Sequence, residues 1–178
     1  MTNTHAPLKE SAVLVPVFRG ADGEVRLVLV RRSERGMHGG QLAFPGGKTE
    51  PTDASPLATA LREAREEIGL TDDRITVVAR LPTVETLTTS YRIVPFLARI
   101  KPPARWSCED REIAEVLEVA VRELALPGAQ GEDLMRLPMW PEPLSISFYQ
   151  IGPHRLWGAS YRILEPLVPR LLAGEWEV

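Results

Sequence analysis

The sequence is poor in cysteine, in long apolar runs and in excess charge, and each shortage excludes a class of protein. A single cysteine, Cys108, rules out an intramolecular disulfide framework and fits a reducing compartment, so we expect a cytoplasmic location. No run of about 18 apolar residues occurs, so no membrane span is predicted. The formal net charge of −3 argues against a general nucleic-acid surface.

The chain length of 178 residues is that of one domain large enough to bury a continuous core. We therefore expect residues 1–178 to form a single domain, with residues 1–10 as a flexible N-terminus. This N-terminus has no apolar segment typical of a secretory signal. The oligomeric state is left open, with a homodimer as one alternative.

Apolar patterns and turn residues predict the order of the secondary structure. The expected strands lie at residues 12–18, 25–31, 75–81, 91–100, 112–119 and 144–152, with a short extended piece at 41–44. The expected helices lie at 56–68 and 158–172, and Pro166 and Pro169 kink or split the second. Residues 83–90, 102–110 and 126–143 are expected to be loops. This order predicts an α+β fold in which a mixed β-sheet is sandwiched between α-helices.

The helix predicted at residues 56–68 is the most informative element, because three carboxylates lie close together on it. Ser55 and Pro56 mark its start and Gly69 marks its end. At about 100° per residue, the three acids share one narrow arc beside an apolar stripe, and we expect them to lie outside that stripe. The acids are Glu63, Glu66 and Glu67, and the stripe consists of Leu57, Ala60, Leu61, Ala64 and Ile68.

Carboxylates this close repel one another, and a divalent cation with a preference for oxygen ligands would remove that repulsion. The alternative is an ordinary solvated helix face with Arg62 and Arg65 as counter-charges. The turn at residues 44–47, Phe-Pro-Gly-Gly, favours the metal site, because backbone without side chains approaches a ligand or a metal closely.

These residues resemble the signature of the Nudix hydrolases, in which a glycine and an acidic residue precede R-E-apolar-x-E-E-x-G-apolar. The matching positions are Gly47, Asp53, Arg62, Glu63, Ala64, Glu66, Glu67, Gly69 and Leu70. The middle acid is Asp53 where the signature has glutamate, and the spacing from Asp53 to Arg62 is one residue longer than the general pattern. The same longer spacing is found in the coenzyme A pyrophosphatase branch of the family.

The resemblance implies the Nudix fold and the metal-dependent hydrolysis of a diphosphate linkage. The implied ligands for Mg²⁺ or Mn²⁺ are Glu63, Glu66, Glu67 and the carbonyl group of Gly47. Arg62 is expected to orient Glu66 or a neighbouring acid, the alternative being a surface ion pair. The general base is expected on a later loop, with Glu112 as first candidate and Glu115 as second, unless a glutamate of the signature such as Glu66 serves. Both later acids are equally explained as solvated surface groups.

The segments before the helix also resemble the coenzyme A pyrophosphatase branch. Val28–Ser33 and Gly40–Gly47 are similar to its second signature, L-L-T-x-R-S/A followed by G-x-x-x-F-P-G-G. This chain has Val30 in place of threonine, is one residue shorter between Ser33 and Gly40, and has Gly36 where an arginine is expected. The candidates for contact with the substrate are Arg31, Arg32, Arg35 and the turn residue Gly46.

The resemblance, which spans roughly residues 12–165, predicts a small-molecule substrate with a nucleotide diphosphate. The leading hypothesis is cleavage of coenzyme A or its derivatives to a 4′-phosphopantetheine species and adenosine 3′,5′-bisphosphate. A second hypothesis within the same fold is a pyrophosphatase for ADP-ribose, dinucleotides or nucleoside triphosphates. A third, of another class, is a non-catalytic nucleotide-sensing module, against which the intact set of three acids argues.

Overall fold

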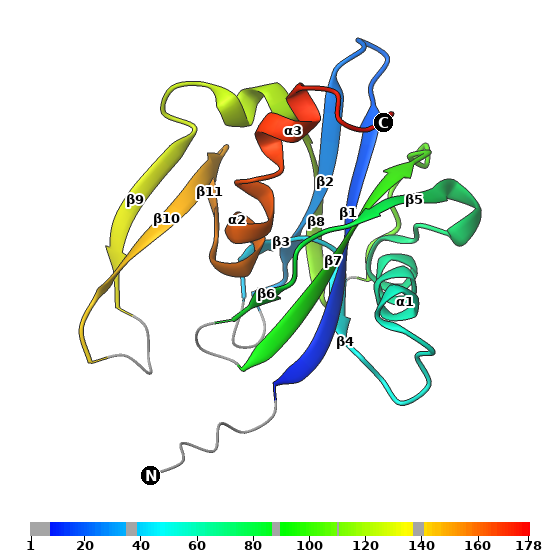
Figure 1. Ribbon diagram of the computed structural model, residues 1–178, viewed down its shortest axis with the longest axis horizontal. Coiled ribbons are helices and arrows are strands. Elements are labelled where there is room, and N and C mark those ends of the chain that lie inside the picture. The colour runs from blue at the N-terminus through cyan, green and yellow to red at the C-terminus, as the bar shows by residue number, and fades with distance from the viewer. Residues whose placement is uncertain (1–7, 35–38, 87–89, 110, 137–140) are drawn as a thin grey trace.

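The computed structural model describes residues 8–34, 39–86, 90–109, 111–136 and 141–178, and a mixed eight-stranded sheet lies at its centre (Figure 1). Strands β1 and β7 run parallel in the middle of this sheet, and its other pairings are antiparallel. The strands are β1 (Lys9–Arg19), β2 (Val25–Arg32), β3 (Leu42–Ala43), β4 (Gly46–Lys48), β5 (Ile75–Arg80), β6 (Val84–Glu85), β7 (Tyr91–Ile100) and β8 (Ile113–Ala120).

A second, antiparallel sheet of three strands lies beside the first, at the left of Figure 1. Its strands are β9 (Gln130–Met135), β10 (Leu144–Ile151) and β11 (His154–Trp157). The α-helices are α1 (Pro56–Ile68), α2 (Gly158–Leu164) and α3 (Val168–Leu172), and short 3₁₀ turns cover Asp72–Arg74 and Val121–Ala125. Within the described part of the chain, no helix has the length and apolar character needed to cross a membrane.

Helices cover both faces of the main sheet. Successive side chains of each central strand point to opposite sides, so apolar residues of one strand pack into a core on each face. On one face, Leu14 belongs to the apolar cluster that contains Ala60 and Ala64 of α1. On the other face, Val15 belongs to the cluster that contains Leu164 and Val168 of α2 and α3. The predicted α+β fold, with a mixed sheet sandwiched between helices, is thus confirmed.

Strands β1 and β2 separate towards one end of the sheet, and the segment 42–48 fills the gap between them. The two strands pair only between Val17↔Leu27 and Arg19↔Val25. Below that point, β4 pairs with β1 at residues 11–13, and β3 pairs with the end of β2. The glycine turn between β3 and β4 is therefore held inside the sheet, directly against the first strand.

The sequence pattern predicted the bounds of several elements correctly and those of others incorrectly. Helix α1 and strand β7 have the predicted bounds, and the predicted helix at 158–172 is split into α2 and α3 around Pro166. The predicted loop at 126–143 was wrong, because β9 lies within it; β9 is largely exposed and polar, so it has no apolar alternation. The predicted flexible N-terminus was too long, since β1 begins at Lys9 and pairs with Tyr91. Residues 1–7 lie outside the described residues.

Candidate active site

Helix α1, which carries the acids, has well-defined ends. The hydroxyl of Ser55 accepts a hydrogen bond from the Ala58 amide at 3.2 Å, and Pro56 occupies the first turn. Gly69 ends the helix in the left-handed conformation, at φ 67°, and donates its amide to the Arg65 carbonyl at 3.1 Å.

The three acids of α1 differ sharply in exposure. The side chain of Glu67 is only 3% exposed, whereas those of Glu63 and Glu66 are 15% and 56% exposed. This order follows from their angular distance from the apolar stripe, since Glu67 lies nearest to it. The expectation that all three acids lie outside the buried stripe was therefore wrong for Glu67.

The glycine turn comes close enough to α1 to contact its acids. The Gly46 amide donates a 2.9 Å hydrogen bond to Oε2 of Glu67. A side chain at residue 46 would overlap the backbone of Ala12 and Val13, and one at residue 47 would overlap the Glu63 carboxylate. Residue 46 therefore requires glycine, whereas a side chain at residue 47 would displace the Glu63 carboxylate; as glycines, both present bare backbone to the two more buried acids.

Arg62 links the loop before α1 to the acids on α1. Its Nε and Nη2 donate to the two carboxylate oxygens of Asp53, each at 3.0 Å. Its Nη1 donates to Glu63 and to Glu66, also at 3.0 Å each, and its Nη2 contacts the carbonyl oxygen of Lys48 at 3.1 Å. Because one guanidinium contacts all of these groups, its position sets the directions of two candidate metal ligands.

Asp53 is itself held by two further donors that the sequence had not indicated. The Glu50 amide and the Thr59 hydroxyl donate to Oδ2 of Asp53, both at 2.9 Å. Hydrogen bonds from Arg62 and Glu50 hold the pKa of the Asp53 carboxyl well below its usual range. Thr59 is fully buried and lies one helical turn before Glu63, and this i,i+4 spacing was the only available signal.

Burial raises the pKa of the Glu67 carboxyl to about 7, although the Gly46 amide and Arg32 oppose the rise. Burial also raises the pKa of Glu63, against the effect of Arg62. The charge of Glu112 adds to both increases. Glu112 is therefore close enough to act electrostatically on the two buried acids of α1.

The structure brings Glu112 to this group and places Glu115 elsewhere. Glu112 lies just before β8, where its carbonyl accepts the Ser33 amide at 2.7 Å. Glu115 lies opposite Arg31 in the β2–β8 ladder, and its carboxylate accepts from Arg31 Nε at 3.3 Å. Since Arg31 alternates with Leu29, its pair with Glu115 lies on the face of the sheet away from α1.

The candidate arginines are likewise separated. Arg32 lies 3.7 Å from Oε1 of Glu67, so its guanidinium belongs to the acidic site. Arg31 is held by Glu115 and by Glu34, each at 3.3 Å. Arg35 lies outside the described residues.

The donor set suits a hard divalent cation. Glu63, Glu66, Glu67 and Glu112 supply carboxylate oxygens, and the raised pKa values of Glu63 and Glu67 reflect burial and mutual repulsion that a cation would relieve. Among the residues that the structure describes, no three acidic, histidine or cysteine side chains already converge on one point. Arg62 holds Glu63 and Glu66, whereas Gly46 holds Glu67.

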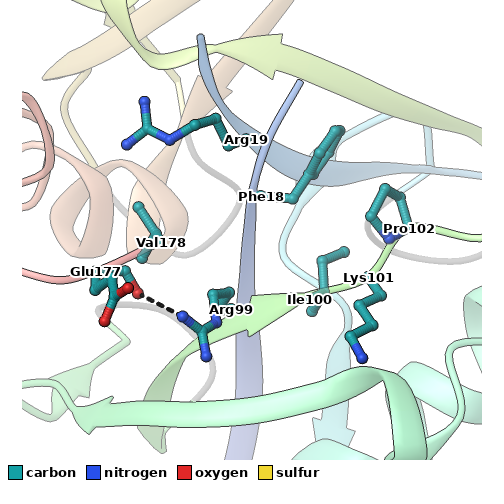
Figure 2. A pocket seen from close by; sticks show the side chains of 8 residues that line it. All are labelled: Phe18, Arg19, Arg99, Ile100, Lys101, Pro102, Glu177 and Val178. Atoms are coloured by element: carbon teal, nitrogen blue, oxygen red, sulfur yellow. Dashed lines mark hydrogen bonds between the residues drawn. The ribbon is translucent and has the colours of Figure 1, made fainter. Parts of the chain in front are cut away.

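A pocket of about 520 Å³ lies at the opposite end of the sheet, beside the last residues of β1 and β7 (Figure 2). Arg19, Arg99 and Lys101 line it, and Arg99 donates to the Glu177 carbonyl at 3.5 Å. None of the acids of α1 borders this pocket, so we assign it no part in the acidic site.

The mixed sheet, the glycine turn and the acidic helix together define a hydrolase of the Nudix class. The model of the NUDIX domain matches residues 8–136, and the chain belongs to the Nudix hydrolase family. It is 36% identical to the Nudix hydrolase NudL of Citrobacter koseri over 155 residues, which cover 86% of this chain and 72% of the relative. It is 34% identical to NudL of Salmonella typhimurium over 163 residues, covering 90% and 77% of the two chains. The protein is therefore a pyrophosphohydrolase of this family.

Solved structures show the same fold at low sequence identity. A MutT/nudix family protein from Enterococcus faecalis aligns with a TM-score of 0.64 at 16% identity, covering 98% of this chain and 64% of the other. RenU of M. smegmatis aligns at 0.56 and 22% identity, covering 68% and 76%. The NUDIX domain of Shewanella oneidensis NrtR, crystallised with ADP ribose, aligns at 0.52 and 15% identity, covering 71% and 82%. Nudix hydrolases generally use divalent metal ions.

Proposed function

We propose that this Nudix hydrolase cleaves the diphosphate of coenzyme A or its derivatives, with Mg²⁺ or Mn²⁺ held by Glu63, Glu66, Glu67 and the Gly47 carbonyl. The observation that carries the chemistry is that Arg62 holds Glu63 and Glu66 while Gly46 and Arg32 contact Glu67, all at one end of the sheet. The coenzyme A specificity rests on the similarity of residues 28–47 to that branch and on the long spacing from Asp53 to Arg62. The products are a 4′-phosphopantetheine species and adenosine 3′,5′-bisphosphate.

Each residue has a distinct task in this proposal. When bound, a divalent ion supplies an activated water and neutralises charge on the phosphoryl oxygens. Glu63, Glu66 and Glu67 would hold the ion, and Arg62 orients Glu63 and Glu66 through its hydrogen bonds to both. Glu112 accepts the proton of the attacking water. It acts electrostatically on Glu63 and Glu67 and is not one of the signature acids that would hold the metal.

Arg32 is the arginine best placed to contact the substrate diphosphate. It lies on the α1 side of the sheet beside Glu67, whereas the guanidinium of Arg31 is already engaged by two carboxylates. A guanidinium forms paired hydrogen bonds with phosphate oxygens, so Arg32 suits this role better than a lysine would.

The test is a substrate panel of coenzyme A, dephospho-coenzyme A, ADP-ribose and nucleoside triphosphates, each with Mg²⁺ or Mn²⁺. We expect kcat/KM to be highest for coenzyme A, with the two products identified by mass. A kcat/KM at least about tenfold higher for ADP-ribose or a triphosphate would exclude the coenzyme A assignment, since tenfold is about 1.4 kcal/mol of discrimination. It would leave the hydrolase chemistry in place.

We also propose a cytoplasmic location, from the single cysteine and the substrate class. A homodimer is proposed only as an alternative to a monomer, and light scattering would decide between them. A non-catalytic nucleotide sensor is disfavoured because it has no need for acids whose pKa values are raised by burial and repulsion.

A further inference from the structure

We propose that Thr59 is a positioning residue of the active site, acting through Asp53 and Arg62 on the metal-binding acids Glu63 and Glu66. This inference rests on the proposed role of those acids and does not depend on which diphosphate is the substrate. Thr59 is not one of the residues of the Nudix signature. It is fully buried, and its only polar side-chain group is a hydroxyl.

Thr59 lies on the arc of α1 that carries the acids. With Glu63 at zero on the helical wheel, Thr59 falls near 320°, between Glu66 near 300° and Glu63. The apolar stripe lies at about 60° to 160°, on another part of the helix. Thr59 is nevertheless fully buried, because the loop at residues 49–55 covers this part of α1. Its burial is therefore due to the site and not to the apolar core.

The hydroxyl of Thr59 has one proton, and the geometry assigns that proton to Asp53. The distance from Oγ1 to Oδ2 of Asp53 is 2.9 Å, against 3.3 Å to the Thr49 hydroxyl and 3.5 Å to the Ser55 carbonyl. A threonine within a helix often bonds instead to the carbonyl four residues before it, which here belongs to Ser55. Thr59 thus satisfies a carboxylate oxygen in preference to the helix backbone.

This bond sets the direction of the Asp53 carboxylate and hence that of Arg62. Oδ2 of Asp53 accepts from Thr59, from the Glu50 amide and from Arg62 Nη2, whereas Oδ1 accepts from Arg62 Nε. With both oxygens fixed, the guanidinium plane of Arg62 is fixed too, and its Nη1 points at Glu63 and Glu66. Without the Thr59 hydroxyl, Asp53 loses one of the two donors that hold it independently of Arg62.

Asp53 stands where the Nudix signature has glutamate. Besides Arg62, the donors that hold its carboxylate are the Thr59 hydroxyl and the Glu50 amide, both to Oδ2.

Two substitutions separate the hydroxyl from the shape of the side chain. Thr59→Val removes the hydroxyl and retains the branched shape, whereas Thr59→Ser retains the hydroxyl and removes a methyl group. We expect Thr59→Val to lower kcat about tenfold with KM changed less than about twofold, the effect of losing a hydrogen bond to a charged group. We expect Thr59→Ser to remain within about threefold of the wild-type kcat.

Mn²⁺ binding gives a readout that does not require turnover. In a titration followed by the paramagnetic signal of free Mn²⁺, we expect Thr59→Val to raise the half-saturating concentration about threefold to tenfold. This effect is smaller than the 10- to 100-fold loss typical for direct partners of metal ligands. Thr59→Ser should bind Mn²⁺ as the wild type does. Melting temperatures in EDTA establish that each variant is folded at the assay temperature.

A purely structural role predicts the opposite pattern. The serine variant, which leaves a small cavity, would then melt lower than the valine variant, and both would retain wild-type kcat and Mn²⁺ affinity below their melting temperatures. That pattern overturns the proposal, as does a serine variant as impaired as the valine variant. In an Asp53→Asn background we expect Thr59→Val to have no further effect, and a full additional loss there would also contradict it.

Glu67→Gln separates failure of this inference from failure of the proposed site. If Glu67→Gln retains normal turnover and Mn²⁺ affinity, the metal site itself is wrong, whatever Thr59 does. If Glu67→Gln loses both and Thr59→Val loses neither, the metal site stands and the role of Thr59 is refuted.

Discussion

Helices cover both faces of the main sheet, and the candidate active site lies on the face covered by α1. Helix α1 runs uninterrupted for 13 residues between a serine cap and a glycine cap. The opposite face is covered by α2 and α3, which are 7 and 5 residues long and are separated near Pro166. Both sets bury apolar residues against the same strands.

The charged side chains on the two faces differ in how far they are buried. On the α1 face, Arg62 contacts three carboxylates, of which Asp53 and Glu63 are largely buried, and the pKa values of Glu63 and Glu67 are raised. On the other face, Arg170 pairs with Glu175 and stacks on Trp176 at the exposed rim. The comparison indicates that chemistry depends on charges held near the core, whereas exposed pairs contribute little to stability.

The largest expected effect comes from removing a buried acid of α1. Glu67→Gln and Glu63→Gln should each lower kcat at least about 100-fold, as other losses of electrostatic transition-state stabilisation do. Glu67→Gln should remain folded because its amide oxygen can still accept the Gly46 amide. Chelation with EDTA should abolish turnover in the wild type, and added Mg²⁺ or Mn²⁺ should restore it. Near-normal turnover of either variant at saturating Mg²⁺ would disprove the metal-site assignment.

The next largest effect concerns the general base. Glu112→Gln should lower kcat about 10- to 100-fold with little change in metal affinity, because it removes a proton acceptor. Steady-state kinetics and a Mn²⁺ titration measure the two quantities. A similar defect in Glu115→Gln, but not in Glu112→Gln, would move the role to the other face of the sheet. If neither variant is impaired, the base is a glutamate of the signature.

A smaller effect on stability follows from the raised pKa of Glu67. The unfolded chain loses this proton near the usual glutamate pKa, whereas the folded protein retains it up to about pH 7. The metal-free protein should therefore lose stability as the pH rises from about 5 to 8, by on the order of 3 kcal/mol from this group.

The measurement is urea unfolding in EDTA at several pH values. Glu67→Gln cannot ionise, so the difference between wild type and variant isolates the contribution of this carboxyl. Glu63, whose pKa is also raised, leaves a weaker trend of the same sign in the variant. A difference between the two proteins that does not change between pH 5 and pH 8 would show that Glu67 is ionised normally.

The smallest effect is expected on the opposite face. Glu175→Gln breaks the exposed pair with Arg170 and should change the free energy of unfolding by less than about 1 kcal/mol. Its kcat should equal that of the wild type, which makes it the matched control for Glu67→Gln. A loss of activity in Glu175→Gln would mean that the two faces are coupled.

The parts of the fold that follow from neighbouring residues were predictable. The bounds of α1 coincide with the prediction because Ser55, Pro56 and Gly69 act within one helical turn of its ends. The split of the C-terminal helix was likewise anticipated from Pro166 and Pro169. Strand β9 was not found, because its exposed sequence is held by pairing with β10.

The sequence by itself determined the Nudix family, the acidic helix and the set of candidate acids, because these depend on residue types at short, fixed spacings. Only the tertiary structure decided which acids belong together. Glu67 accepts the Gly46 amide because the glycine turn lies against it, and Glu115 faces away because the β2–β8 register places it opposite Arg31. Thr59 meets Asp53 because a loop folds back over the helix. Such contacts join segments that no local spacing relates, so they arise only when the chain packs.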